Sequence, residues 1–474
     1  MTDVLRVGIL TPLQQQQHAD PRATADFVNS VVNWHVFQPP FSRSKENRET
    51  VPVLLDGPLE QDPKDDRIWS ARLRPGIRFS DGTALTARHV ARSLEGSTRF
   101  VSEADLEVDG DRLIFRLKRP NRRFDWVLCH QNSAVVLDKR GRYLGTGPYV
   151  LVPSSEPSEI RLVHNPHYQG EVAIPRVDLK VYPVDEDGHP SRLIRAVNSG
   201  EVDFTFSLSR DDLRSVRGVH KWMGQGNSIA FLFFNTERPY FRRRDIRQAL
   251  SRAIDRRELA ARSYTSPLAF AATGLLPANM GALPDGLRPD LANARRLLAE
   301  AGGAVKRTPL RMMVIHTPRP YLPHPQRTAE SLVEQLAALG LEVEIEPARD
   351  IADYYRRTAS GDYDLVLSGW IPDTPDLVTL FEALASSEAI PGRKESSFSC
   401  SNLARFSEPS MDAALAAFRR DPTPVNLRRF GEVLNAERPF LPLLYGSEIV
   451  VHSWRVKNRP KEFRYRPFFA EMSF

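Results

Sequence analysis

The sequence predicts an α/β protein with more than one domain. Its 474 residues exceed what one hydrophobic core usually organises. From residue 310 onward, strand patterns over 310–315, 341–345 and 363–368 alternate with helix patterns over 326–339 and 351–360. This order is typical of a three-layer domain with parallel strand pairs. The composition, with 41% hydrophobic and 26% charged residues, indicates an ordered globular chain.

The first half of the chain predicts shorter strands joined by tight turns. Residues 4–10 form a first strand pattern. A turn at Pro75-Gly76 separates strand patterns at 69–74 and 77–79, and the next turn, at Asp81-Gly82, fits a hairpin. A second hairpin is expected between 106–108 and 113–117, across Asp109-Gly110.

A basic amphipathic helix is predicted over 242–257. Its apolar positions, among them Ile246, Leu250 and Ile254, fall on one stripe, and its arginines mostly occupy the other face. Such a helix could contact nucleic acid, and the net charge of +6 is compatible with that. A solvated outer face is the favoured interpretation, since no aromatic residue interleaves the arginines.

Motifs that would carry catalysis or hold a cofactor are missing from the sequence. There is no Gly-x-Ser-x-Gly elbow, no phosphate-binding loop and no His-Glu-x-x-His. His164 and His167 flank Asn165-Pro166, so turn histidines explain them better than a metal pair. Cys129 and Cys400 are 271 positions apart, and two separate thiols are favoured over a bridge. We therefore expect no catalytic residue, no metal ligand and no cofactor.

The first residues do not resemble a secretory signal. Asp3 and Arg6 interrupt the apolar run, and no stretch of the chain reaches 18 consecutive apolar residues. The expected location is cytoplasmic for the chain as written, and periplasmic or extracellular if a leader has been removed.

The segment after the strand pattern at 363–368 is the candidate binding site. It carries one large aromatic residue, Trp370, and two carboxylates, Asp373 and Asp376. An aromatic ring beside a carboxylate at a strand end suits a cationic or amino-bearing ligand. A loop with helix-capping aspartates explains the same residues.

Several blocks of the sequence, in order, resemble the family 5 extracellular solute-binding proteins, the oligopeptide, dipeptide and nickel binders of ABC importers. The blocks that carry this resemblance are 69–90 (Trp-x-x-x-Leu-Arg-Pro-Gly-Ile-x-Phe-Ser-Asp-Gly-Thr-Ala-Leu-Thr-Ala-Arg-His-Val), Gly145–Tyr149, Asn165–Tyr168, Ser199–Asp203, Phe234–Thr236 with Asp245–Asp255, and Gly361–Asp376. Because the blocks fall in order along the sequence, the resemblance extends over the whole chain.

The resemblance implies an α/β fold of the two-lobe periplasmic-binding-protein type, class II with an extra inserted subdomain. A discontinuous lobe one would comprise 1–40, 155–235 and 439–474, with 41–154 as the inserted subdomain. Lobe two would comprise 236–438. A hinge between the lobes would close them on a ligand.

For function, the resemblance implies a monomeric binding protein, not an enzyme, that captures a peptide or another small polar ligand and partners an ABC transporter permease. The backbone of Gly369, Trp370 and Ile371 would pair with a peptide, and Asp373 would hold its α-amino group. Pro372 removes one N–H beside the site.

The chain is also similar to the solute-binding half of cytosolic sugar-phosphate-stress transcription regulators. Because the first strand begins at Val4, with no DNA-binding head before it, nucleic acid is not an expected partner of this chain alone. A cytosolic ligand sensor or accessory protein is the alternative function, and an enzyme evolved from the same fold is a third.

Overall fold

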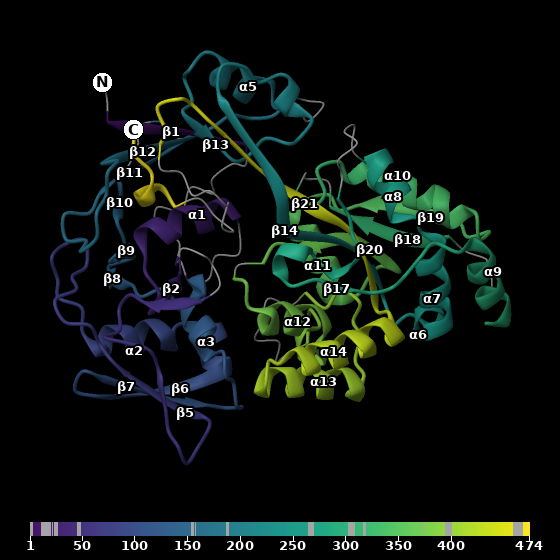
Figure 1. Ribbon diagram of the computed structural model, residues 1–474, viewed down its shortest axis with the longest axis horizontal. Helices are drawn as coiled ribbons and strands as arrows, with labels where there is room; N and C mark the ends of the chain where they lie inside the picture. The colour runs from purple at the N-terminus through teal and green to yellow at the C-terminus, as the bar shows by residue number, and fades with distance from the viewer. Residues whose placement is uncertain are drawn as a thin grey trace. The chain divides into compact units, whose positions relative to one another are not determined.

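The structure is a computed structural model of the 474-residue chain, and it has two compact units. It describes residues 3–10, 20, 22, 27–44, 49–152, 156, 158–185, 189–263, 270–301, 309–315, 319–372, 374–393, 401–457 and 468–474. Unit 1 comprises 1–223, 373–375 and 449–474, and unit 2 comprises 224–372 and 376–448. Both contain strands and helices, which confirms the predicted α/β class (Figure 1). The predicted lobe and subdomain boundaries stay a prediction.

Unit 2 is built around a mixed sheet in which β14 and β21 are neighbours, followed by β20, β18 and β19. Its strands are β14 (His220–Phe234), β15 (Phe270–Ala271), β18 (Leu310–Val314), β19 (Val343–Pro347), β20 (Leu365–Trp370) and β21 (Phe440–His452), with the separate pair β16 (Gly274–Leu276) and β17 (Leu283–Pro284). β18 runs parallel to both β19 and β20, as the alternating pattern predicts, whereas β14 is antiparallel to β20.

Helices cover both faces of this sheet, so unit 2 has the three layers predicted from the sequence. The helices are α6 (Pro239–Arg242), α7 (Arg244–Ala253), α8 (Arg256–Ser263), α9 (Leu291–Glu300), α10 (Pro325–Ala337), α11 (Ile351–Ser360), α12 (Leu377–Ala385), α13 (Pro409–Arg420) and α14 (Pro424–Glu437). One hydrophobic core joins the sheet to α7–α10 and a second joins it to α11–α14. Figure 1 shows α8–α10 and α12–α14 on opposite sides of β20.

Unit 1 has a mixed sheet with the order β10, β11, β12, β1, β13 and then the end of β21, together with a separate four-stranded antiparallel sheet. The first contains β1 (Val4–Ile9), β10 (Tyr149–Val152), β11 (Glu159–His164), β12 (Arg176–Val181) and β13 (Phe204–Thr205); the second contains β4 (Glu60–Gln61), β5 (Ile68–Arg72), β6 (Ala104–Asp109) and β7 (Arg112–Leu117). Two small hairpins pair β2 (Phe41–Arg43) with β3 (Thr50–Pro52) and β8 (Leu137–Lys139) with β9 (Arg142–Leu144).

The helices of unit 1 are α1 (Phe27–Val36), α2 (Ala87–Glu95), α3 (Thr98–Glu103), α4 (Phe124–Cys129) and α5 (Ser191–Asn198). Short 3-10 turns in the two units are η1 (Gln131–Ser133), η2 (Asp212–Arg214), η3 (Ala278–Met280), η4 (Ser387–Ala389) and η5 (Phe469–Glu471). The hairpin across Asp109-Gly110 is confirmed, since β6 and β7 pair antiparallel on either side of it.

Two local predictions are wrong. Residues 77–79 form no regular strand, although an isolated antiparallel bridge joins Arg78 to Ala84 across the predicted Asp81-Gly82 turn. The basic helix predicted over 242–257 is broken, because α7 ends at Ala253 and α8 begins at Arg256.

The solvated-face interpretation of the basic helix also fails for Arg247, which is only 2% exposed. Its guanidinium donates to the carbonyl oxygens of Glu437 at 2.6 Å and Phe241 at 2.8 Å. Carbonyls at a helix C-terminus lack helical partners and carry partial negative charge, so a long cationic side chain satisfies them well. Arg243, Arg244 and Arg257 are exposed, as predicted.

Within unit 1, a buried histidine on α1, His35, contacts the C-terminal segment. His35 is 0% exposed, its Nδ1 lies 2.6 Å from the Val31 carbonyl oxygen, and its Nε2 accepts from the Phe469 N–H at 2.8 Å. Its ring stacks on that of Phe469 with centroids 4.4 Å apart. These contacts require a neutral ring with the proton on Nδ1, and burial lowers the pKa of His35 from 6.5 to about 4.

We expect this histidine to make the folded protein less stable as the pH falls from 7 to 5. The unfolded chain takes up a proton near pH 6.5, which the folded protein resists until about pH 4, so the free energy of unfolding should drop by about 2 kcal/mol over this interval. Urea titrations at several pH values measure the drop. His35→Gln should remove this part of the pH dependence; an unchanged slope in that variant would contradict the assignment.

Candidate functional site

The candidate site is the carboxyl end of β20, which extends beyond its parallel neighbour. The ladder between β20 and β14 continues to the pair Trp370–Ile229. The described ladder between β20 and β18 ends at the pair Leu367–Val314, three residues before Trp370. The last residues of β20 are therefore paired on the β14 side and have no described strand partner on the β18 side.

Gly369 is held at this end by a very close approach of neighbouring atoms. A Cβ added to Gly369 would lie 2.3 Å from the Ile229 carbonyl oxygen and 2.4 Å from Cδ2 of Tyr321. Only glycine avoids this overlap, so the Tyr321 ring covers the space where any other residue would place a side chain. Tyr321 follows β18 in the chain and was not singled out from the sequence.

The side chains beside Gly369 point to opposite faces of the sheet, as strand geometry requires. Trp370 is half-buried and packs against the core shared with α11–α14. Ile371 is also half-buried and packs against the core shared with α7–α10. Both residues are thus fixed by packing while part of each stays accessible.

Buried hydroxyl groups lie just before this end. The Tyr354 hydroxyl and the Ser368 hydroxyl are 2.8 Å apart and both residues are buried. Burial raises the pKa of Tyr321 and of Tyr354 above the usual tyrosine value, so both phenols stay neutral. They can orient the strand end through hydrogen bonds but supply no charge to it.

Of the two aspartates in this segment, the structure describes Asp376 and not Asp373. Asp376 caps α12: its carboxylate accepts from the N–H groups of Val378 and Thr379, at 3.3 and 3.0 Å. Its interpretation as a structural cap is confirmed. Asp373, the residue predicted to hold an α-amino group, lies outside the described residues.

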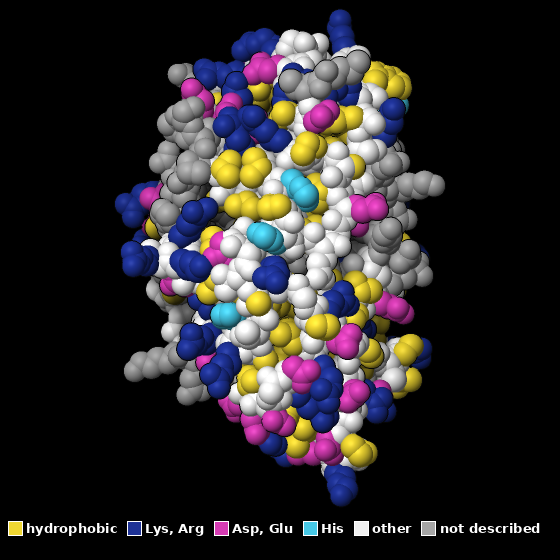
Figure 2. All heavy atoms as spheres, turned by 90° about the vertical axis from the view of Figure 1, so that its left-hand side faces the viewer, with side chains coloured by type: hydrophobic (Ala, Val, Ile, Leu, Met, Phe, Trp, Pro, Cys, Tyr) yellow, Lys and Arg dark blue, Asp and Glu magenta, His cyan; other side chains and the backbone are white. Residues whose placement is uncertain are grey.

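The part of the chain that the structure describes shows neither a metal site nor a membrane-spanning helix. It contains no group of three or more histidine, cysteine or acidic residues placed to hold a metal. None of its helices is long and apolar enough to cross a membrane. Cys129 is buried and its thiol is free, while Cys400 lies outside the described ranges. Figure 2 shows basic and acidic side chains interspersed on the face that it draws.

The whole chain shares its fold with solved structures of binding proteins. The dipeptide-binding protein from Pseudoalteromonas sp. SM9913 in complex with Met-Leu has a TM-score of 0.81 at 20% identity, covering 99% of each chain. The periplasmic binding protein DppA from Helicobacter pylori, in complex with the peptide STSA, has a TM-score of 0.81 at 18% identity, covering 99% of this chain and 98% of the other. The fold is therefore the two-lobe fold of the ABC-transporter-associated periplasmic binding proteins.

The sequence agrees with this class. Residues 49–392 match the bacterial extracellular solute-binding proteins, family 5. The protein belongs to this family, as its resemblance predicts. Its relatives include the probable ABC transporter periplasmic-binding protein SapA of Escherichia coli K12, 27% identical over 381 residues. That match covers 74% of this chain and 66% of SapA, so the chain spans slightly less than two thirds of that relative.

Replacement of Gly369 by alanine should destabilise unit 2, because the added methyl group overlaps a carbonyl oxygen and a buried ring. We expect a loss of about 1–3 kcal/mol in the free energy of unfolding, measured by urea denaturation. Gly226→Ala on β14 is the matched control, since its Cβ would approach no atom closer than 3.0 Å. Equal losses in the two variants would show that the packing around Gly369 is not special.

Proposed function

We propose that this protein captures a peptide, or another small polar ligand, at the carboxyl end of β20 and delivers it to an ABC transporter. The observation that carries the proposal is the extension of β20 past β18. An extended peptide can bind a strand edge of this kind through main-chain hydrogen bonds, with side-chain pockets adding specificity. Gly369, Trp370 and Ile371 would supply the backbone edge.

Rigid placement of this edge supports a binding role. Ile229 and Tyr321 confine Gly369, and the side chains of Trp370 and Ile371 are anchored in different cores. A preorganised edge loses little conformational entropy when a ligand pairs with it. The half-buried Trp370 ring can also pack against a ligand side chain or an amino group.

In this proposal Asp373 holds the α-amino group of the ligand. It lies three residues beyond Trp370 and carries the only carboxylate between Trp370 and the capping Asp376. A carboxylate–ammonium contact is a charge-assisted hydrogen bond, which is about twice as strong as a neutral one.

The relatives support a transport role and a location outside the cytoplasm. SapA is named as a periplasmic-binding protein of an ABC transporter, and the two solved structures hold peptides. We infer the same class of ligand and a permease partner for this chain, acting as a monomer in the periplasm. Native mass spectrometry of the purified protein would identify a co-purified ligand directly.

Asp373→Asn should weaken the binding of di- and tripeptides with a free amino terminus by about ten- to hundredfold, as measured by isothermal titration calorimetry. The same peptides with an acetylated amino terminus should bind wild type and variant equally, because they lack the charge that Asp373 recognises. Asp421→Asn, which changes a carboxylate just after α13, is the matched control and should leave every affinity unchanged.

The test requires that Asp373→Asn weaken the binding of free peptides and leave the binding of acetylated peptides unchanged. If Asp373→Asn weakens both kinds of peptide to the same extent, the aspartate does not contact the amino group. If wild type binds no peptide of either kind, a peptide ligand is excluded, and the role of Asp373 in holding a peptide amino group fails with it.

A further inference from the structure

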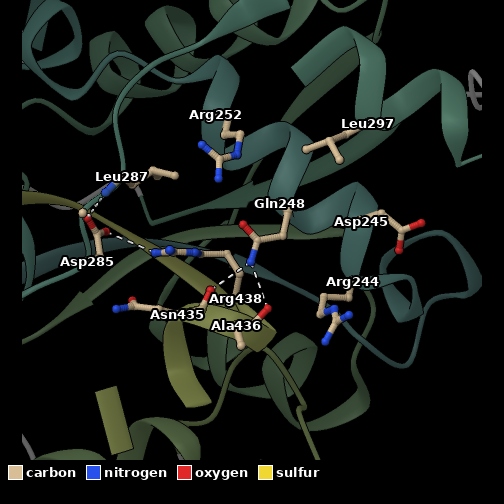
Figure 3. Close-up of a pocket in the computed structure, with 11 residues that line it drawn as sticks. Arg244, Asp245, Gln248, Arg252, Asp285, Leu287, Leu297, Asn435, Ala436 and Arg438 are labelled. Carbon is tan, nitrogen blue, oxygen red and sulfur yellow. Dashed lines mark hydrogen bonds and ion pairs between the residues drawn. The ribbon is translucent and has the colours of Figure 1, made fainter. Parts of the chain in front are cut away.

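A cavity lies within unit 2, away from the residues proposed to bind a peptide. Its volume is about 530 Å³, and none of residues 369–371 lines it. Its walls come from α7, from the C-terminal end of α14 and from the segment that leads from β17 to α9 (Figure 3). Three arginines, Arg244, Arg252 and Arg438, are among the lining residues.

One face of α7 forms a polar wall of the cavity. Arg244, Gln248 and Arg252 are spaced by four residues and therefore share a helix face, opposite the buried stripe of Ile246 and Leu250. The Gln248 side chain donates to the carbonyl oxygens of residues 435 and 436 at 2.9 Å. These carbonyls at the end of α14 are therefore already satisfied and do not require the arginines.

A buried carboxylate, Asp285, is shared by two arginines. Arg256 donates to both of its oxygens at 3.0 Å, and Arg438 donates to one of them at 3.1 Å. The side chains of all three residues are at most 8% exposed. Burial lowers the pKa of Arg438, and Arg256 and Arg252 lower it further, whereas Asp285 opposes the shift. One carboxylate thus faces more positive charge than it neutralises.

Arg252 adds a third cation to this cluster. Among the described residues none forms a hydrogen bond or ion pair with its side chain, and its Nε is buried without a partner. The Nε of Arg438 is likewise buried and unpartnered within the described part of the chain. In Figure 3 the guanidinium of Arg252 points toward the space above Arg438.

The other charged residues that line the cavity form ion pairs outside this cluster. Arg244 pairs with Glu437 at 3.5 Å, and Asp245 pairs with Arg243 at 3.0 Å and points away from Arg252 and Arg438 in Figure 3. The cluster of Arg252, Arg256, Arg438 and Asp285 therefore carries two positive charges in excess. Arg438 is buried and Arg252 is partly buried, so an anion in the cavity would offset the repulsion between these guanidinium groups.

We propose that this cavity binds a small oxyanion of the phosphate type, held by Arg252 and Arg438. Guanidinium groups offer paired N–H donors that match phosphate oxygens, and a dianion balances the two excess charges. Arg438 adopts φ 50° at the end of α14, a left-handed conformation in which glycine is usual and other residues are strained.

The size of the cavity indicates that the phosphate belongs to a small metabolite. A volume of about 530 Å³ is within the range of small-molecule sites and exceeds what one inorganic ion fills. The side chains of Leu287 and Leu297 line the same space and can contact the uncharged part of such a molecule. A phosphomonoester should therefore bind more tightly than inorganic phosphate.

Calorimetry on the full-length protein tests the site with inorganic phosphate, with glycerol phosphate and, at matched ionic strength, with chloride. We expect both phosphates to bind and chloride not to compete. Arg252→Gln should raise the dissociation constant about tenfold or more. Arg252→Lys keeps the positive charge but lacks the paired N–H donors of a guanidinium group, and should raise the constant less. Arg257→Gln on the exposed face of α8 is the matched control and should bind like wild type.

Thermal unfolding separates a binding role from a structural one. Without phosphate, Arg252→Gln should unfold at the same temperature as wild type or higher, since the Arg252 side chain has no partner among the described residues and repels Arg438. With phosphate, only wild type and the Arg257→Gln control should gain stability. The proposal is overturned if neither phosphate binds, if chloride stabilises equally, or if Arg252→Gln and Arg257→Gln respond alike.

Discussion

The burial of β20 on both of its faces is the constraint on which unit 2 depends. Leu365 and Leu367 point into the core shared with α7–α10, and Val366 points into the core shared with α11–α14. All three are 0% exposed. Because side chains alternate along a strand, a shift of one residue would exchange the two sets, so that neither set would fit the core around it. The register of β20 is thereby set, and so is the position of Gly369 and Trp370 at its end.

Much of this fold could be predicted from periodicity, and the failures have physical causes. The alternation of strands and helices predicted the parallel pairs of β18 with β19 and β20. The burial of Arg247 could not be predicted, because its partners, the carbonyls at the end of α14, are about 190 residues away in the sequence. Charge patterns along one helix do not show such partners.

In the candidate sites, too, some features could be predicted from the sequence and others could not. The strand end at 369–371 could be located from the sequence, because a strand pattern stops there and a loop pattern follows. That Gly369 must be glycine could not, since Ile229 and Tyr321 reach it only in the folded chain. The cavity at Arg252 and Arg438 joins residues 186 positions apart, and α7 alone resembles any solvated basic helix. A spacing of four residues between Arg244, Gln248 and Arg252 was its only local signal.

Unit 2 thus combines a rigid strand end, suited to backbone recognition, with a separate arginine-lined cavity suited to an anion. The central claim is that the end of β20 pairs with an extended ligand. Hydrogen–deuterium exchange tests it most directly, by comparing the amides of residues 369–371 with and without a saturating tripeptide. The claim predicts slower exchange of this segment in the presence of the peptide. Bound peptide with unchanged exchange at 369–371 would contradict it.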